Sequence, residues 1–316
     1  MPHPVVYSTA LRTRFRGLDR RDGVLLRGDA GWGEFSPFWD YDDAVSVPWL
    51  AAAREAAETG YPAALRPRVP VNVTVPAVGP ERAAEIVRAS GGCTTAKIKV
   101  AEPGQTLADE VERVAAVREA LGPGGHVRVD ANAAWDVDTA ISRLAELDRA
   151  AGGLQYAEQP VAGVEDLAEV RRRSGVRIAA DESVRRAEDP LRVARAGAAD
   201  VLVLKVQPLG GVRACLRIAE EAGLPVVVSS ALESSVGLAA GVALAAALPE
   251  HTLDGVPLAA GLATGHLLED DVTSDPLLPA GGHLPVRPVE PDAVPAADDE
   301  TRARWLARLE SVAALR

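Results

Sequence analysis

The stretch from residue 95 to residue 131, TAKIKVAEPGQTLADEVERVAAVREALGPGGHVRVDA, contains the pattern that decides the fold. Two short runs rich in β-branched residues, at 95–100 and 127–131, flank a segment, Leu107–Leu121, in which apolar residues recur at helical spacing. Gly122 follows this segment and is typical of a helix end. The order of strand, helix and strand predicts a crossover between two parallel strands.

The same pattern repeats from about residue 70 onward and predicts eight strands. They are Val71–Val75, Thr95–Val100, Val127–Ala131, Leu154–Ala157, Arg177–Ala180, Val201–Val206, Val226–Ser229 and Gly261–Thr264. Eight strands that alternate with helices favour a closed (β/α)₈ barrel, an α/β fold, although a doubly wound open sheet shows the same alternation. The periodicity alone does not choose between these two architectures.

The two ends of the chain do not follow this pattern. Residues 1–68 contain a hairpin signal followed by a helical stretch, Ala44–Thr59, so we expect a smaller α+β domain there. Residues 69–283 form the predicted barrel domain. Residues 284–316 are rich in proline and end in a predicted helix, Arg302–Leu315, which we expect to pack back on the small domain.

The composition restricts the partners of the protein. Its 316 residues include 34 Lys and Arg against 45 Asp and Glu, so neither nucleic acid nor an anionic membrane is expected as the main partner. The longest apolar run, Val236–Leu248, is shorter than the ~18 residues of a membrane span and predicts a buried helix. Cys93 and Cys215 are too few for a disulfide framework, and the first residues do not resemble a signal peptide, so a cytoplasmic protein is expected. The sequence leaves the oligomeric state open.

Charged residues stand at the carboxyl ends of five consecutive predicted strands, about one strand–helix unit apart. They are Lys97 and Lys99, Asp130, Glu158, Asp181, and Lys205. Neighbouring parallel strands lie about 4.8 Å apart, so we expect the three carboxylates to converge. Crowded carboxylates repel one another unless a cation lies between them. An all-oxygen set suits Mg²⁺, with Mn²⁺ as a possible substitute.

The lysines suggest the chemistry. Strands two and six of an eight-stranded barrel lie on opposite sides, so Lys99 and Lys205 are expected to face each other across the mouth. A carboxylate substrate on the metal would present its α-carbon to both amines. Lys99 can act as a base only when neutral, and burial, the metal and the adjacent Lys97 all disfavour its charge. The implied reaction is removal of a proton beside a carboxylate.

Candidates for substrate contacts lie at the same strand ends. They are Asn132, Arg128, Ser229, Ser230 and Gly261. Ser229 or Ser230 could hold a second carboxylate of the substrate, and a local role in a turn is about as probable for either. Each motif is weak alone, because a charged strand end is usually a solvated rim. Lys205 is the exception, since an unpaired ammonium group among buried aliphatic side chains is costly.

Several segments resemble the enolase superfamily, and the resemblance spans about residues 10–290. The segments are Gly31–Pro37, Thr94–Lys99, Ala180–Ser183, Leu204–Gly211 and Val228–Glu233. The resemblance implies a modified barrel under a capping domain. It is strongest to the actinobacterial branch that converts 2-succinyl-6-hydroxy-2,4-cyclohexadiene-1-carboxylate to o-succinylbenzoate and water in menaquinone synthesis. The partner implied is thus a small-molecule dicarboxylate.

The resemblance also implies the role of each residue. Lys99 abstracts the proton and returns it to the departing hydroxide, with Lys97 beside it in the catalytic set, and Lys205 holds a positive charge over the enediolate. Asp130, Glu158 and Asp181 are the implied Mg²⁺ ligands. One rival reading is an N-acylamino-acid racemase or dipeptide epimerase with paired lysine bases. Another is a non-catalytic barrel that binds a metal or a carboxylate. The small domain is shorter than in many superfamily members, so its contacts with the substrate are not transferred.

Overall fold

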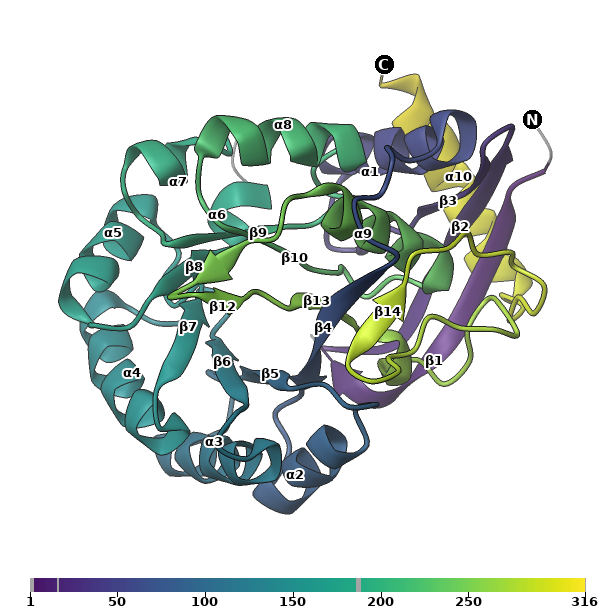
Figure 1. Ribbon diagram of the computed structural model, residues 1–316. Coiled ribbons are helices and arrows are strands. Elements are labelled where there is room, and N and C mark those ends of the chain that lie inside the picture. Colours follow the sequence, from purple (N-terminus) through teal and green to yellow (C-terminus); the bar gives the residue numbers. More distant parts are fainter. Residues whose placement is uncertain (1–2, 16, 186–188, 316) are drawn as a thin grey trace.

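The structure, a computed structural model, describes residues 3–15, 17–185 and 189–315. In this part of the chain eight parallel strands follow one another in the order β10-β9-β8-β7-β6-β5-β4-β13, and helices surround them (Figure 1). A parallel bridge between Ser229 and Gly261 joins β10 to β13. This bridge closes the ring, so the barrel is confirmed and the open sheet is excluded.

The predicted strands are all present, with small differences in their bounds. They are β4 Arg68–Val75, β5 Thr95–Lys99, β6 His126–Asp130, β7 Leu154–Glu158, β8 Ile178–Ala180, β9 Val201–Leu204, β10 Val226–Val228 and β13 Ala260–Ala263. The strand predicted at Val201–Val206 ends at Leu204. Beyond it the backbone forms turns in which the carbonyl groups of Lys205 and Gln207 accept hydrogen bonds, and these turns lead into the next helix. Lys205 is therefore the first residue beyond its strand.

Helices connect successive strands around the outside of the barrel. They are α2 Pro80–Arg88, α3 Leu107–Leu121, α4 Val137–Ala151, α5 Val164–Arg173, α6 Glu182–Arg185, α7 Arg192–Arg195, α8 Val212–Ala222 and α9 Ser235–Ala247. Both ends of α3 are capped. Thr106 and Asp109 form a capping box at its start, and Gly122 caps its end, as the sequence predicts. The apolar run Val236–Leu248 forms α9, which is buried on nearly every side, as predicted.

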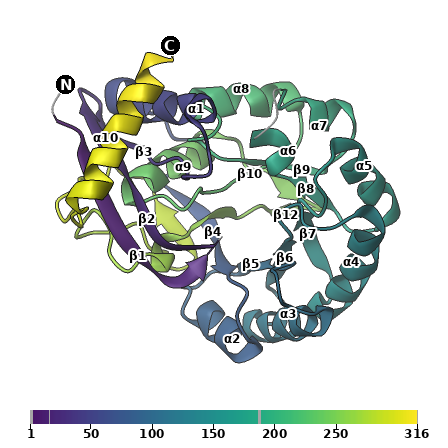
Figure 2. The ribbon, with the colours of Figure 1, turned by 180° about the vertical axis from the view of Figure 1, so that it is seen from behind.

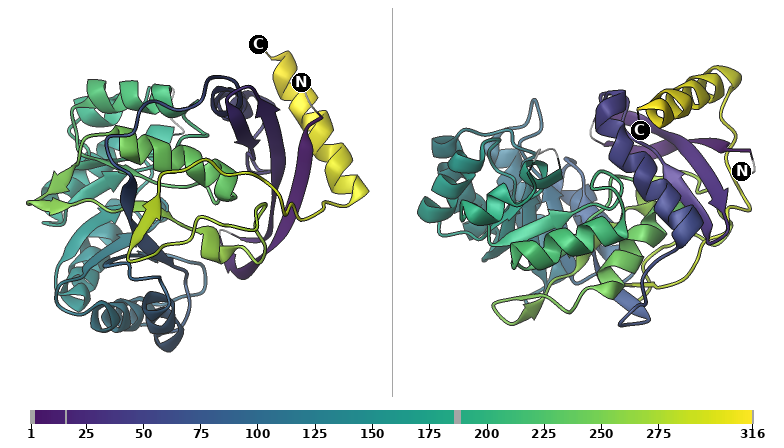
Figure 3. Two further views of the ribbon diagram at one scale, coloured as in Figure 1. Left: turned by 45° about the vertical axis from the view of Figure 1, so that its right-hand side comes forward. Right: turned by 90° about the horizontal axis from the view of Figure 1, so that it is seen from above.

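The small domain is a three-stranded antiparallel sheet covered by helices. Its sheet has the order β1-β2-β3, and its strands are β1 Val5–Phe15, β2 Leu18–Gly28 and β3 Gly31–Phe35. Helix α1, Asp43–Arg54, continues into a π-helical turn, η1 Glu55–Thr59, where one continuous helix was predicted. Helix α10, Asp299–Ala314, lies along this domain, far in sequence from the strands it covers (Figures 2 and 3). We call residues 3–67, without the undescribed residue 16, the capping lobe.

Short elements lie before and after β13, the last strand of the barrel. The hairpin β11 Thr252–Leu253 and β12 Val256–Pro257 precedes β13, and the short helix η2 Gly265–Leu267 follows it. Strand β14, His283–Pro285, then pairs with β4 in antiparallel register, so it crosses the predicted boundary at residue 283.

The capping lobe and the barrel share apolar contacts through α9, which packs against β3 as well as against the barrel strands. Gly33 of β3 allows a close approach within the lobe, because a Cβ there would lie only 1.9 Å from the carbonyl oxygen of Ala53. The next residue, Glu34, accepts hydrogen bonds from the start of α9. Among the described residues, no helix is long and apolar enough to cross a membrane.

Candidate active site

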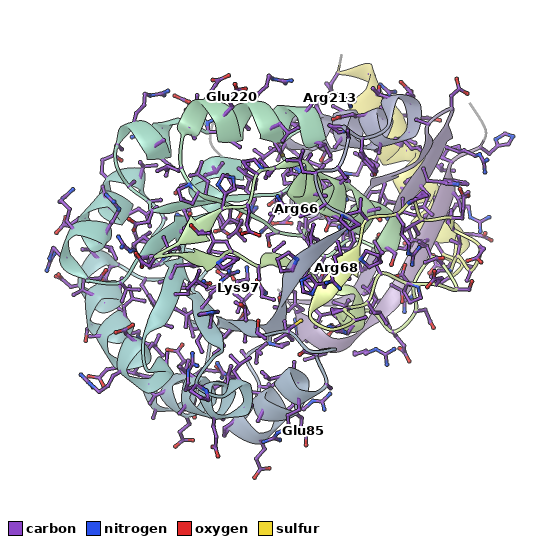
Figure 4. All side chains as sticks on the ribbon, viewed as in Figure 1. Arg66, Arg68, Glu85, Lys97, Arg213 and Glu220 are labelled. Atoms are coloured by element: carbon purple, nitrogen blue, oxygen red, sulfur yellow. The ribbon has the colours of Figure 1, made fainter. Side chains whose placement is uncertain are left out.

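The barrel strands place charged side chains at one height around the mouth of the barrel. Parallel pairing aligns Lys99 of β5 with Asp130 of β6, and Asp130 with Glu158 of β7. Asp181 follows the end of β8, the next strand in the ring. Side chains alternate along a strand, so Lys97 and Lys99 point to the same face of β5. Figure 4 shows Lys97 inside the ring of strands.

Lys97 joins two of the three carboxylates. Its Nζ atom donates to Glu158 Oε1 at 2.8 Å and to Oε2 at 3.0 Å, and it lies 3.1 Å from Asp130 Oδ2. All three side chains are buried. One buried cation therefore lies between two carboxylates and relieves their mutual repulsion.

Lys99 is held at the edge of the pocket by two acceptors. Its Nζ atom donates to Asp130 Oδ2 at 2.7 Å and to Asn132 Oδ1 at 2.6 Å. Asn132 has φ +46°, a left-handed conformation that asparagine adopts more readily than most residues. Its amide nitrogen donates to Glu182 Oε1 at 3.2 Å. The ring of Phe15, from the capping lobe, has its centroid 5.5 Å from the Lys99 ammonium nitrogen.

Asp181 accepts hydrogen bonds from two cations, one on each oxygen. Lys205 Nζ donates to Oδ2 at 2.6 Å, and Arg185 Nε donates to Oδ1 at 2.8 Å. Lys205 and Lys99 both line the same pocket. They come from β9 and β5, which are separated in the ring by the three strands that carry the carboxylates. Two amines thus stand on either side of three buried carboxylates.

The packing of these charges shifts their pKa values in different directions. Burial opposes the ionisation of Asp130 and of Asp181, but the surrounding ammonium and guanidinium groups outweigh burial and hold both pKa values well below the usual range. Burial and the charges of Asp130 and Asp181 raise the pKa of Glu158 to about 7. Burial disfavours the charged form of Lys97, but the adjacent carboxylates outweigh it, so the pKa of Lys97 is raised. The cluster therefore holds Lys97 charged and leaves Glu158 as its most easily protonated carboxylate.

The carboxylates form a donor set that suits a hard divalent cation, because Mg²⁺ prefers carboxylate oxygens. Within the described residues, no three acidic, histidine or cysteine side chains are arranged ready to hold a metal ion. In this structure, the ammonium groups of Lys97 and Lys205 form ion pairs with the three carboxylates. Beside them, Glu182 Oε2 is a buried acceptor with no hydrogen-bond partner in the described part of the chain. The chemistry of these residues fits Mg²⁺, and a bound cation would take over part of the neutralisation.

The pocket above the carboxylates brings most of the predicted residues together. Its walls include Lys97, Lys99, Lys205, Asn132, Ser229, Ser230 and Gly261. Ser230 Oγ lies 2.8 Å from the hydroxyl of Thr264, and Ser229 Oγ lies 3.5 Å from the carbonyl of Gly261. The pocket shares Phe15 and Lys99 with a neighbouring cavity of about 480 Å³. This neighbouring cavity therefore provides space beside Lys99 for a ligand that is too large for the pocket above the carboxylates alone.

Comparison with known proteins places the chain in a family. Its residues 80–293 match a family described as Enolase C-terminal domain-like, and residues 6–57 match one described as Enolase N-terminal domain-like. The o-succinylbenzoate synthase of Thermobifida fusca (strain YX) is 63% identical over 309 residues, which cover 98% of this chain and 95% of that protein. The chain belongs to the o-succinylbenzoate synthase family of the enolase superfamily.

Two further relatives agree with this membership. The o-succinylbenzoate synthase of Mycolicibacterium smegmatis is 52% identical over 308 residues, 96% of this chain and 93% of that protein. The L-Ala-D/L-Glu epimerase of Bacillus subtilis, a solved structure, has a TM-score of 0.75 at 21% identity, over 94% of this chain and 98% of its own. This structure shares the fold. As a member of the o-succinylbenzoate synthase family, the chain is an enzyme.

In this member of the family, Arg128 lies deeper in the barrel than the described residues that line the pocket. Its side chain is fully buried and donates to Gln155 Oε1 at 2.7 Å, to Asn72 Oδ1 at 2.9 Å and to the carbonyl of Ala259 at 2.8 Å. Arg128 points into the barrel like Asp130, but it lies two residues earlier on β6 and therefore one layer deeper. Arg128 therefore lies below the pocket walls, and its contact with the substrate stays a prediction.

Other residues of the pocket were missed by the sequence analysis. They are Phe15, Phe38, Thr74, Arg185, Ala231, Leu232 and Thr264. Thr74 lies near the carboxyl end of β4, and Arg185 lies one helical turn after Asp181, so spacing could have found both. Phe15 and Phe38 belong to the capping lobe, and no local signal links them to the barrel mouth.

Hydrogen bonds also join the capping lobe to the start of α9 in this member of the family. Glu34 accepts hydrogen bonds from the backbone N–H groups of Ser234 and Gly237, each at 3.1 Å, and from the hydroxyl of Tyr7 at 2.8 Å. An acceptor at a helix start satisfies donors that have no partner within the helix. Glu233 lies beside Glu34, and burial followed by the charge of Glu34 raises its pKa to about 7.

Proposed function

We propose that the protein is a hydro-lyase that converts 2-succinyl-6-hydroxy-2,4-cyclohexadiene-1-carboxylate to o-succinylbenzoate and water, a step of menaquinone synthesis. The observation that carries this proposal is the pair of lysines, Lys99 and Lys205, on opposite sides of three buried carboxylates. The names of the relatives at 63% and 52% identity support the same reaction. We also propose that the protein is cytoplasmic and that its domains divide at residues 68 and 283.

Lys99 is the group that moves the proton. In its neutral form it takes the proton from the carbon beside the substrate carboxylate, and the electron pair of that C–H bond becomes part of the new ring π-system. The C–O bond to the hydroxyl group then breaks, and Lys99 returns the proton to the leaving oxygen, which departs as water. Asp130 and Asn132 hold the amine in place for both transfers.

The other charged residues hold the substrate and its developing charge. Asp130, Glu158 and Asp181 would bind Mg²⁺, with Mn²⁺ as a possible substitute, and the metal would neutralise the negative charge that forms on the substrate carboxylate. Lys205 would hold a fixed positive charge on the opposite face of the substrate, and Lys97 keeps two of the carboxylates together.

The serines at the end of β10 are proposed to bind the second carboxylate of the substrate. Ser229 and Ser230 line the same pocket as Lys99, together with Gly261. A Cβ at Gly261 would lie 2.8 Å from Ser229 Oγ, so glycine keeps this serine close to β13. Asn132 closes the pocket on the side of Lys99.

Separate replacements of the two lysines test the proposal. Lys99→Ala should abolish dehydration, because general acid–base transfer is worth ~10² to 10⁴-fold and, in the proposed mechanism, Lys99 alone takes and returns the proton. Lys205→Ala should also be strongly impaired, whereas Lys205→Arg should recover part of the rate if only fixed charge is needed. All three variants and the parent would be assayed for dehydration and for racemisation of N-acylamino acids.

The racemisation assay decides between this proposal and paired-base catalysis. An arginine remains charged and cannot act as a base. If Lys205→Arg is as inactive as Lys205→Ala, and the parent racemises N-acylamino acids faster than it dehydrates, the dehydratase assignment is wrong.

A further inference from the structure

Arg185 connects the carboxylate of Asp181 with the capping lobe. Its Nε atom donates to Asp181 Oδ1 at 2.8 Å, and Nη2 donates to Glu182 Oε1 at 2.6 Å. On its other edge, Nη1 donates to the hydroxyl of Tyr41 at 2.5 Å. The guanidinium is buried and lines the pocket. Because a guanidinium presents its donors in a rigid plane, binding three partners at once fixes its own orientation and that of Asp181.

The position of the Tyr41 hydroxyl is set by the capping lobe. Tyr41 lies between β3 and α1, and its ring packs edge to face against Phe38 and Trp49, with centroids 5.8 Å and 5.9 Å apart. Its backbone carbonyl accepts a hydrogen bond from Arg308 of α10. Any displacement of the lobe from the barrel would therefore carry this hydroxyl away from Arg185.

The two carboxylate oxygens of Asp181 accept hydrogen bonds from two cations that have different roles. Lys205 on Oδ2 is the amine that the proposed reaction needs beside the substrate. Arg185 on Oδ1 also donates to Glu182 and Tyr41, so three of its five N–H groups hold it to the protein. When Lys205 turns to the substrate, Arg185 is the group that still orients Asp181.

We propose that Arg185 is a positioning residue for Asp181, and that Tyr41 makes the Mg²⁺ affinity depend on how the capping lobe sits on the barrel. This inference rests on the proposed function, because it takes Asp181 as a metal ligand. By linkage, a substrate that draws the lobe onto the barrel strengthens metal binding, and the metal holds the lobe with the same free energy.

Calorimetric titration with MgCl₂ alone tests the inference on the full chain, stripped of metal with EDTA and without substrate. Tyr41→Phe removes the hydroxyl but leaves the ring contacts and all charges, and it should raise the Kd for Mg²⁺ about fivefold. Arg185→Lys keeps the charge but loses the planar fork, and it should weaken Mg²⁺ binding at least as much. The parent affinity in Arg185→Lys would overturn the inference, because charge alone would then suffice.

The double variant shows whether Tyr41 acts through Arg185. Tyr41→Phe added to Arg185→Lys should weaken Mg²⁺ binding no further, since the hydroxyl has lost the group through which it acts. Losses that multiply in the double variant would mean that the hydroxyl acts by a separate route, and this result would also overturn the inference.

Arg213→Gln is the matched control, because Arg213 joins the barrel to the lobe at another place. From α8 it donates to Glu55 Oε1 at 2.7 Å and to the carbonyl of Gly60 at 2.8 Å (Figure 4). This variant should melt at a lower temperature while its Mg²⁺ affinity stays at the parent value. Arg213→Gln leaves the hydrogen bond between Tyr41 and Arg185 in place, so an equal loss of affinity in this variant would mean that Mg²⁺ binding does not depend on that bond, and would overturn the inference.

The same titration separates this inference from the proposed function. If the parent binds Mg²⁺ and both single variants bind it equally well, only the role of Arg185 and Tyr41 is wrong. A parent chain that binds no Mg²⁺ would overturn the metal assignment itself, and the inference with it.

Discussion

Glu233→Gln should make the folded protein more stable at pH 8 and leave its stability near pH 4 almost unchanged. Glu233 is 3% exposed, and burial together with the charge of Glu34 raises its pKa from 4.5 to about 7. A side chain at Gly237 would collide with both glutamates, so the two carboxyl groups and the start of α9 are closely packed. The carboxyl group therefore resists losing its proton in this place.

The sign and size of the effect follow from linkage. Between pH 4.5 and 7 the folded chain keeps a proton on Glu233 that the unfolded chain has lost, so stability falls as the pH rises through this window. The full shift corresponds to about 3 kcal/mol lost at pH 8 relative to pH 4. A glutamine carries no charge to bury, and its oxygen can still accept the hydrogen bond that Ala231 N–H donates to Glu233 at 2.7 Å.

Thermal melts of the two proteins at pH 4.5 and pH 8 provide the assay. The variant should melt several degrees above the parent at pH 8 and close to it at pH 4.5. Glu112→Gln, on the exposed side of α3, is the control and should match the parent at both values. If Glu233→Gln changes the melting temperature equally at both pH values, the raised pKa of Glu233 is not the cause and the reasoning fails.

Two further predictions concern the proposed metal. Exhaustive treatment with EDTA should remove dehydratase activity and added MgCl₂ should restore it, because the charge on the substrate carboxylate has no comparable stabiliser; activity that survives the treatment would contradict the metal assignment. Asp181→Asn keeps the shape of the side chain but removes one ligand charge, so Mg²⁺ titrations should show weaker binding, and this loss should exceed any loss of stability seen in thermal melts. An unaltered Mg²⁺ affinity would mean that another acid, such as the adjacent Glu182, is the ligand.

The strands of the barrel could be predicted because their apolar runs are locally distinct. Their periodicity alone did not show that the barrel closes, since closure depends on the pairing of Ser229 with Gly261, which are remote in sequence; the resemblance to the enolase superfamily supplied that expectation. Strand β1 was missed as well. Its eleven residues, Val5–Phe15, mix apolar and basic side chains, and only its first half is buried against the rest of the lobe. Both features therefore depend on contacts between residues that are distant in the sequence.

The candidate site could be predicted where a charge interrupts a buried strand. Asp130, Glu158 and Lys205 stood out for this reason. Depth along the strand was not visible, which is why Arg128 was placed in the pocket although it lies one layer below. Tyr41 was not visible either, because its hydroxyl reaches the site from another domain and its sequence neighbours give no sign of that contact.

The charges around the pocket imply that metal and substrate bind cooperatively. The described acidic side chains there are Asp130, Glu158, Asp181 and Glu182, and the basic ones are Lys97, Lys99, Lys205 and Arg185. Counted in their ionised forms, these acidic and basic groups balance without any ligand, so Mg²⁺ alone adds an uncompensated charge to a buried place, which is costly.

A dianionic ligand removes that cost by restoring the balance. Calorimetric titration with MgCl₂ in the presence of saturating o-succinylbenzoate should therefore give a Kd about tenfold lower than titration without it. By the same linkage, Mg²⁺ should tighten the binding of o-succinylbenzoate by the same factor, and a monocarboxylate such as benzoate should give a smaller gain. Equal Mg²⁺ affinity with and without the dicarboxylate would show that the ammonium groups of Lys97 and Lys205 move aside at no cost, and that the balance of charge does not govern binding at this site.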